Sequence, residues 1–264
     1  MPYIETAIRA AREAGDIINQ ASRSIETINV QTKAFHDYVT DVDRASERAI
    51  VDILTHYCPS HAVLSEECGL MGQTNSEFVW VVDPIDGTTN FIHGFPQYAV
   101  SIALRRGNDI LEAVVYDPLK DEMFTAVRGE GARLNKRRIR VSGRIDLSSA
   151  LIGTGFPFRE GDDFEGYAKV FTQVARRTSG IRRAGAASLD LCYVACGRLD
   201  AFWETGLKSW DVAAGSLIVL EARGLVTDLD GNDGYLDSGR IVAGTPKILG
   251  ALMPILNGSA PVQA

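Results

Sequence analysis

The stretch Trp80–Phe91, with the sequence WVVDPIDGTTNF, constrains the fold more than any other part of this chain. Phe78–Val82 is a short apolar run rich in β-branched residues, which predicts a buried strand. We expect Asp83-Pro84 to end this strand, because proline has no N–H for a strand ladder and restricts the residue before it. The sequence therefore predicts a carboxylate at the end of a strand, held by a rigid sheet and facing open space.

The next residues, Asp86–Asn90, place helix-capping side chains around a glycine. Such a turn can present consecutive backbone N–H groups to an anion. Asp-Pro and Asp-Gly are also common turn dipeptides, and either one alone is more typical of a turn than of a ligand. Together, Asp83 and Asp86 beside this turn predict a site for a hard cation next to a cradle for phosphate.

Residues 83–91, DPIDGTTNF, resemble the signature of the inositol monophosphatase family, and Trp210–Gly215, WDVAAG, is a second similar motif. The resemblance extends from the first predicted helix to about residue 250. It implies an α/β (mixed α+β) fold, layered α-β-α-β-α like other sugar phosphatases. It also implies a lithium-sensitive phosphatase that holds two to three Mg²⁺ ions in its active site.

The resemblance implies a set of metal ligands that comprises Glu66, Asp83, the Ile85 carbonyl, Asp86 and Asp211. Asp83 would bridge two ions, as in two-metal sites with ions about 3.5–4 Å apart. Adjacent glutamates are usually solvated surface, but Glu66 and Glu67 follow the predicted strand Ala62–Ser65. For Asp211, which starts a predicted helix, the alternative is an N-terminal cap.

The catalytic residues implied by the resemblance are Asp43, Thr88 and Glu66. Thr88, oriented by Asp43, would accept a proton from a metal-bound water or position it for in-line attack on phosphorus. The family pattern Val-Thr-x-x-Asp ends at Asp43, although a helix-capping role for Asp41 or Asp43 also explains these side chains.

The resemblance also implies substrate contacts, with Glu204 binding a substrate hydroxyl. Gly185–Ser188 resembles the substrate-binding turn of the family, in which Ala186 stands where a hydroxyl residue is frequent. His93 is expected to be a surface or structural residue. The full set of expected substrate contacts is Asp86, Gly87, Thr88, Thr89, Gly185, Ala187, Glu204 and Asp211, with Lys33, Glu67 and Arg183 as weaker candidates.

The periodicity of the remaining chain predicts two closely packed lobes. Residues 1–145 would form an α+β lobe that carries most metal ligands, and residues 146–264 an α/β lobe that carries Asp211 and the substrate contacts. In the first lobe we expect a helix over residues 3–23, a loop over 31–37 and, after the signature, an antiparallel meander.

Composition limits the class of protein. The net charge of −7 argues against a general nucleic-acid or membrane-surface binder, which needs a basic face. No run of 18 or more apolar residues is present, and charged residues near the N-terminus are unlike a secretory signal, so a cytoplasmic protein is expected. The basic cluster at residues 136–140 is expected to be a solvated edge strand.

The function that this sequence favours is the hydrolysis of myo-inositol monophosphate to myo-inositol and phosphate. Alternatives are a related phosphatase acting on fructose 1,6-bisphosphate, histidinol phosphate, adenosine 3′,5′-bisphosphate or NADP, or a non-catalytic scaffold that binds another macromolecule. The cluster at 136–140 and Arg182-Arg183 would support the scaffold. The expected partner is a small phosphorylated polyol or sugar, nucleic acid is not expected, and the resemblance suggests a homodimer.

Overall fold

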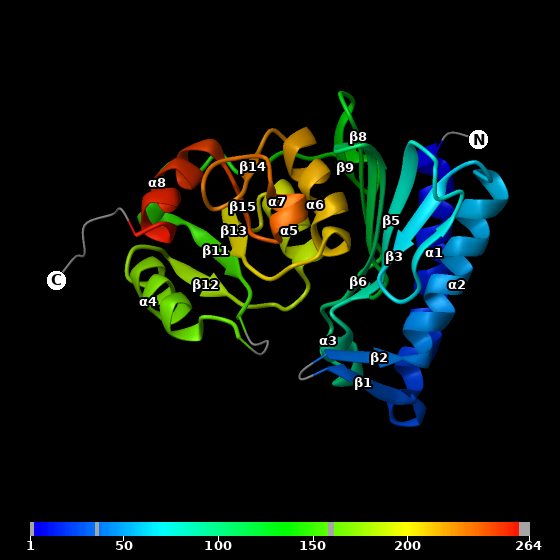
Figure 1. Cartoon of the computed structure of the whole chain (residues 1–264). Helices are drawn as coiled ribbons and strands as arrows, with labels where there is room; N and C mark the ends of the chain where they lie inside the picture. The colour runs from blue at the N-terminus through cyan, green and yellow to red at the C-terminus, as the bar shows by residue number, and fades with distance from the viewer. Residues whose placement is uncertain (1–2, 35–36, 158–160, 259–264) are drawn as a thin grey trace.

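The computed structural model describes residues 3–34, 37–157 and 161–258. These residues form five layers, in which two large sheets alternate with three layers of helices (Figure 1). Three apolar cores fill the spaces between the layers. The α-β-α-β-α arrangement predicted from the sequence is therefore confirmed. Within the described residues, no helix has both the length and the apolar character needed to cross a membrane.

The outer helical layer consists of α1 (Tyr3–Ala21) and α2 (Asp41–Tyr57). α1 packs a row of buried small residues against the large sheet, which allows the helix to approach closely. α2 begins at Thr40, whose side chain accepts the backbone N–H groups of Val42 and Asp43. The N-cap is Thr40 and neither aspartate, but the capping role considered for Asp43 is confirmed in another form. As the third residue of the capping box, its side chain accepts the backbone N–H of Thr40.

Two short strands, β1 (Val30–Ala34) and β2 (Asp37–Thr40), form a separate antiparallel hairpin before α2. The loop predicted over residues 31–37 is therefore wrong for its described part, and residues 35–36 lie outside the described residues. Residues 31–33 are exposed and polar, so no apolar alternation marks the strand. The hairpin brings Lys33 to the acidic site described below.

The large sheet has the strand order β10-β9-β8-β7-β6-β5-β3-β4. The predicted meander is confirmed as β6 to β8, and the basic cluster lies at the β10 edge as expected. The bounds are β3 Ala62–Ser65, β4 Gly69–Gly72, β5 Phe78–Asp86, β6 Ala99–Arg106, β7 Asp109–Asp117, β8 Glu122–Val127, β9 Gly131–Leu134 and β10 Arg137–Arg138.

Strand β5 does not end at Asp83-Pro84 as predicted, but continues to Asp86. Asp83 pairs with Ser101 and Asp86 pairs with Ala99, with an irregularity between them that contains Pro84. A bulge tolerates proline because a residue there is not required to donate to the ladder. Both aspartates are consequently held by the central sheet, which fixes their positions more firmly than a free turn would.

The second sheet has the order β12-β11-β13-β15-β14 and is mixed, since β13 pairs in parallel with β11 and antiparallel with β15. Helices α4 (Phe164–Ala175) and α8 (Pro246–Leu256) cover one of its faces. Strand β12 was not predicted, because a run of three residues carries no periodicity. The bounds are β11 Leu151–Thr154, β12 Gly180–Arg182, β13 Ala201–Glu204, β14 Leu225–Thr227 and β15 Ile241–Gly244.

The middle layer, α5 (Ala187–Ala195) and α6 (Ser209–Glu221), lies between the two sheets. Both helices are apolar on nearly all sides, as expected for helices with no face toward solvent. Gly215 lets them pack tightly, since a Cβ there would lie 2.6 Å from the Cβ of Leu191. This layer positions residues from the second half of the chain against the end of β5.

We predict opposite effects for alanine at two helical glycines. Gly215→Ala should lower the free energy of unfolding by about 1–3 kcal/mol, because the added methyl group overpacks the α5–α6 contact. Gly250→Ala in α8 is the matched control, since an added Cβ meets no atom of the described residues within 4 Å. It should raise stability by about 0.5–1 kcal/mol. Urea unfolding measures both, and equal effects would refute the close packing.

Candidate active site

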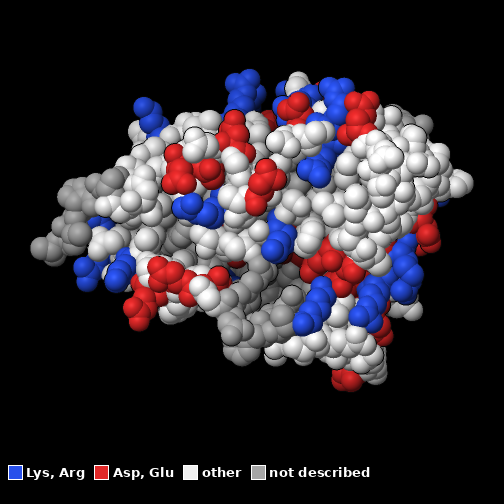
Figure 2. Space-filling model, viewed as in Figure 1, with Lys and Arg blue, Asp and Glu red and all other residues white. Residues whose placement is uncertain are grey.

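A cavity of about 440 Å³ lies where the end of β5 meets the starts of α3 (Thr88–Ile92), α5 and α6. Figure 2 shows acidic side chains gathered in the hollow between the two large sheets, above the β1–β2 hairpin. The lining brings together nine of the predicted site residues, namely Glu66, Asp86, Gly87, Thr88, Thr89, Gly185, Ala187, Glu204 and Asp211, together with the weaker candidate Arg183.

Three carboxylates meet at the base of this cavity. Asp83, Asp86 and Asp211 each place one carboxylate oxygen within 4.8 Å of the others. Asp83 is 1% exposed and Asp86 is 8% exposed. Among the described residues, neither of these two forms an ion pair with a lysine or arginine. The fold therefore concentrates negative charge where little water can screen it.

This crowding changes the acidities of the carboxyl groups. Burial, followed by repulsion from Glu66 and Asp86, raises the pKa of Asp83 well above its usual range. Burial raises the pKa of Asp86 to about 6, against the lowering effect of its hydrogen bonds with Ser188. Burial and the carboxylate of Asp211 raise the pKa of Glu66 to about 7, although Lys33 opposes them. Ionising these carboxyl groups together costs free energy, because their charges repel one another. A bound divalent cation would neutralise these charges, so the cluster suits such an ion.

Glu66 lies on the turn between β3 and β4, beside Glu67 and Lys33. The ammonium group of Lys33 is 3.2 Å from the Glu66 carboxylate and 2.5 Å from that of Glu67. The buried side chain of Glu47 in α2 anchors this turn, since its Oε1 accepts the Ser65 hydroxyl and the backbone N–H groups of Glu67 and Cys68. Sequence reasoning missed Glu47, because a glutamate on a helix carries no sign that its carboxylate is buried.

Asp43 and Thr88 form a hydrogen-bonded pair at the edge of the acidic cluster. The Thr88 hydroxyl is 3.0 Å from Oδ1 of Asp43 and 3.1 Å from the Ile85 carbonyl oxygen. The other oxygen of Asp43 accepts the backbone N–H and the hydroxyl of Thr40, at 2.8 and 2.5 Å. Burial raises the pKa of Asp43, while these hydrogen bonds oppose the rise. The carboxylate is therefore fixed in orientation and faces the hydroxyl of Thr88, a residue that lines the cavity.

Hydrogen bonds between distant segments hold the cavity together. Ser188, at the start of α5, donates its backbone N–H and hydroxyl to Oδ2 of Asp86, at 2.7 and 2.5 Å. The side-chain amide of Asn90 reaches the carbonyl oxygens of Ala184 and Gly185, at 2.9 and 3.2 Å. Neither role was predicted for Ser188 or Asn90. Ser188 belongs to the substrate-binding turn and Asn90 to the signature, so both residues lie in recognised motifs. Only the fold shows which segments their hydrogen bonds join.

The outer part of the cavity presents groups suited to a polar ligand. Glu204 ends β13 and packs against Gly155, where a Cβ would lie 1.9 Å from the Glu204 side chain. The guanidinium group of Arg183 lies 5.3 Å from the centre of the Phe156 ring. Ala186 is buried, and its Cβ would lie 3.3 Å from a Cβ added at Gly87. It therefore packs against the turn at Gly87 and does not line the cavity.

Four further residues near the cavity were not predicted as site residues. His93 was expected to be a surface or structural residue; it is exposed, but it lines the cavity. Tyr38 and Leu207 also line it. Asp190 lies behind it and is 1% exposed, and burial raises its pKa well above the usual range. Its Oδ1 has no hydrogen-bond partner among the described residues.

Comparison with known proteins agrees with this geometry. The model of the inositol monophosphatase family matches residues 1–259. The chain belongs to the inositol monophosphatase family. Among curated relatives, a protein named Nus factor SuhB from Pseudomonas aeruginosa is 50% identical, over 98% of this chain and 97% of the relative.

Solved structures of the family show the same fold. The chain superposes on the extragenic suppressor protein SuhB from Bartonella henselae with a TM-score of 0.95, at 41% identity over 98% of this chain and 100% of the other. It superposes on inositol monophosphatase from Anabaena (Nostoc) sp. PCC 7120 with a TM-score of 0.84, at 34% identity over 98% of this chain and 97% of the other. The family thus includes chains named for a phosphatase and chains named for a Nus factor.

The raised acidities give a prediction for the metal-free protein in EDTA. A carboxyl group whose pKa is higher in the folded state stabilises the fold below its unfolded pKa of about 4, and this stability is lost as pH rises through the folded value. Stability should therefore fall between about pH 4 and pH 7, the window set by Asp86 at about 6 and Glu66 at about 7.

Asp83→Asn should reduce the loss of stability that the metal-free protein shows as pH rises. At pH 8 the variant should exceed the wild type in free energy of unfolding by at least about 1 kcal/mol, and at pH 4 the two should agree. Urea unfolding at a series of pH values measures the difference. An Asp83→Asn variant less stable than the wild type at pH 8 would contradict the repulsion.

Proposed function

We propose that this chain hydrolyses phosphate monoesters of small polyols, with myo-inositol monophosphate as its substrate and Mg²⁺ as its cofactor. The observation that carries the proposal is the cluster of Asp83, Asp86 and Asp211 at the base of an open cavity, beside the Asp43–Thr88 pair. A phosphate monoester dianion resists nucleophilic attack until its charge is neutralised. Buried carboxylates alone would repel it, so the proposal requires cations.

Glu66, Asp83, Asp86 and Asp211 would hold the magnesium, with the Ile85 carbonyl as a further oxygen ligand. All are oxygen donors, as Mg²⁺ prefers, and the charge of the cluster matches divalent cations. When bound, magnesium would neutralise the phosphate oxygens and lower the pKa of a coordinated water. Lys33, which pairs with Glu66 and Glu67, would adjust the charge of this set from outside.

The chain's own residues would position the nucleophile. Thr88 lines the cavity with its hydroxyl and donates to Asp43, so an oxygen lone pair remains to accept a proton from the attacking water. Asp43, fixed by Thr40, would receive the threonine proton in turn. The water oxygen then bonds to phosphorus as the ester bond breaks, and the departing alkoxide takes a proton from solvent.

Other residues would orient the substrate. The backbone N–H groups of Gly87, Thr88 and Thr89 begin α3 and would hold phosphate oxygens. Glu204 would accept a hydrogen bond from a ring hydroxyl, with Gly185 and Ala187 forming the wall beside it. Arg183 lines the same cavity and would contact a polar group of the substrate. These roles, the division of the chain at residue 145 and the homodimer stay predictions.

A second candidate function rests on the relatives. The chain is 50% identical to a protein named Nus factor SuhB, and several more relatives carry that name. We propose as the alternative that this chain acts as a Nus factor, a folded scaffold in transcription, with phosphatase chemistry secondary. The name of these relatives counts against the expectation that nucleic acid is not a partner. That expectation stays a prediction.

Phosphate release separates the two functions. We expect Mg²⁺-dependent turnover of inositol 1-phosphate, inhibited by Li⁺ and abolished by EDTA. Fructose 1,6-bisphosphate, histidinol phosphate, adenosine 3′,5′-bisphosphate and NADP should turn over more slowly. Asp83→Asn should lower kcat by at least about 100-fold, because it removes a central oxygen ligand.

Asp52→Asn is the matched control, since Asp52 is exposed on α2 and should leave turnover unchanged. If another substrate in the panel is preferred, the proposed metal site stands and the assignment of inositol monophosphate as the substrate is rejected. Absence of metal-dependent release from every substrate would reject the phosphatase and favour the scaffold.

A further inference from the structure

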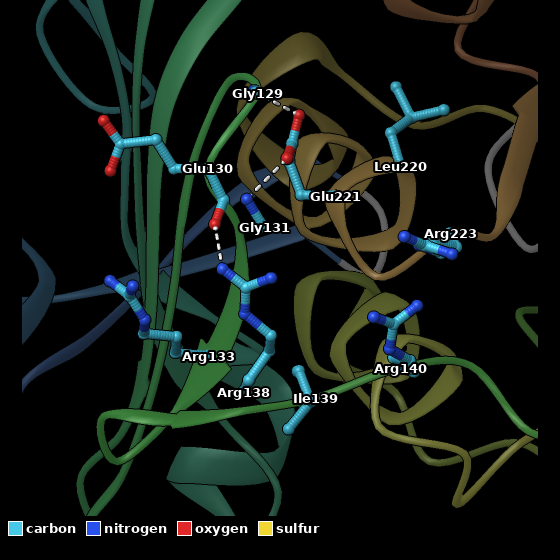
Figure 3. A pocket seen from close by; sticks show the side chains of 10 residues that line it. All are labelled: Gly129, Glu130, Gly131, Arg133, Arg138, Ile139, Arg140, Leu220, Glu221 and Arg223. Atoms are coloured by element: carbon cyan, nitrogen blue, oxygen red, sulfur yellow. Dashed lines mark hydrogen bonds between the residues drawn. The ribbon is translucent and has the colours of Figure 1, made fainter.

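A second cavity, of about 470 Å³, lies at the other end of α6 and shares no lining residue with the acidic site. It is bounded by the β8–β9 turn, the β9–β10 hairpin and the C-terminal end of α6 (Figure 3). About 15 Å of helix separates Asp211 from Glu221, at a rise of about 1.5 Å per residue. The cavity is therefore distinct from the candidate active site.

Four arginines line this cavity, namely Arg133, Arg138, Arg140 and Arg223. None of them forms an ion pair with a carboxylate within the described part of the chain. The cavity also contains Glu130 and Glu221, so its lining carries a net charge of +2 in a chain whose net charge is −7. All four arginines are exposed, and they gather around one cavity of an acidic chain.

The two glutamates do not neutralise the arginines. Both carboxylate oxygens of Glu221 accept backbone N–H groups, from Gly129 and from Gly131, each at 2.8 Å. The side chain of Glu130 points away from Arg138 and Arg140 in Figure 3, while its backbone carbonyl accepts a hydrogen bond from Arg138 at 3.0 Å. Arg138, Arg140 and Arg223 thus present N–H donors to the cavity, and within the described residues none of them has an acidic partner.

Three of the four arginines occupy positions that carry an energetic cost. Arg133 and Arg138 stand directly opposite each other on β9 and β10, where like charges repel across the strand pair. Arg223 follows α6 at φ 69°, in the left-handed region, and Arg223 and Gly224 make the paired hydrogen bonds of a Schellman motif to Leu220 and Val219. Glycine is the usual residue there, so the arginine side chain is retained at a conformational cost.

We propose that this cavity binds a small ligand with a chain of phosphate groups, such as a nucleoside triphosphate. Arg140 and Arg223 approach the cavity from separate segments, and in Figure 3 their guanidinium groups face the same space as Arg138. Guanidinium forks match phosphate oxygens in geometry and charge. Several phosphates, rather than one, match guanidinium groups that come from separate segments.

The size and the apolar lining favour a small molecule with an organic part. The volume is within the range of small-molecule sites, about 300–1,000 Å³. Leu220, which is 39% exposed, and Ile139 add apolar surface beside the arginines, against which a flat ring can pack. A polymer would need a basic groove that continues beyond the cavity.

Calorimetric titration of the full chain with ATP and with inorganic tripolyphosphate, in EDTA, tests the proposal. EDTA keeps the acidic site free of metal, so that its carboxylates repel the phosphates. We expect wild-type binding of both probes, tighter for ATP because of its base. Arg140→Ala and Arg223→Gly should each weaken binding at least about tenfold, as expected for the loss of a charge-assisted contact.

Arg137→Ala is the matched control, because Arg137 adjoins Arg138 on β10 but does not line the cavity. It should leave the affinity for both probes unchanged. Arg223→Gly should also raise the melting temperature, since glycine relieves the left-handed backbone, so its lost binding cannot reflect misfolding. If tripolyphosphate binds more tightly than ATP, the cavity recognises the phosphate chain alone, and the claim that the ligand has an organic part is wrong.

Three outcomes would overturn the site. They are no binding of either probe, equal weakening by Arg137→Ala, and a single-stranded RNA decamer that displaces ATP with higher affinity. The last result would assign the cavity to nucleic acid instead. Because the titration needs neither Mg²⁺ nor turnover, its failure leaves the proposed phosphatase function untouched.

Discussion

Mutual repulsion among buried carboxylates is the constraint on which this structure depends. Asp83, Asp86 and Asp211 hold carboxylate oxygens within 4.8 Å of one another, and two of the three are almost inaccessible to water. Two charges about 4 Å apart repel by about 4 kcal/mol at an effective dielectric constant of about 20. A fold that keeps such groups together must hold them with its strongest elements, and here these are a central strand and a buried helix.

The surrounding contacts show how this repulsion is contained. Asp86 receives two hydrogen bonds from Ser188, and Asn90 ties the signature to Ala184 and Gly185. These bonds join the end of β5 to the start of α5, so the two halves of the chain meet at the cluster. The middle helical layer then sets the position of Asp211. The close packing at Gly215 fixes α6 against α5, and α6 carries Asp211. The geometry of the acidic site therefore depends on this packing.

The sequence predicted the site better than its surroundings. The nine-residue signature and the Trp-Asp motif contain the three aspartates that the resemblance named as ligands, and the structure brings these three together. The extent of β5 was mispredicted, since Pro84 is tolerated at an irregularity that only the pairing with β6 reveals. The β1–β2 hairpin was read as a loop, because its exposed residues show no apolar alternation.

Long-range roles could not be predicted at all. Glu47 anchors a turn about twenty residues away, and nothing in its helical neighbours shows that its carboxylate is buried. The four arginines of the second cavity illustrate the same limit. Arg138 and Arg140 belong to the basic cluster at residues 136–140, which was expected to be an edge strand or to support the scaffold alternative. The fold adds Arg133 from β9 and Arg223 from the end of α6.

Thermal unfolding during a Mg²⁺ titration tests the central claim most directly, that the acidic cluster is a cation site. A ligand that binds only the folded state stabilises it, by about 2.7 kcal/mol at 100 times its Kd. The account predicts a melting temperature that rises with Mg²⁺ concentration for the wild type, with little or no rise for Asp211→Asn. NaCl of equal ionic strength should not reproduce it. A melting temperature that ignores Mg²⁺, or rises equally in Asp211→Asn, would contradict the claim.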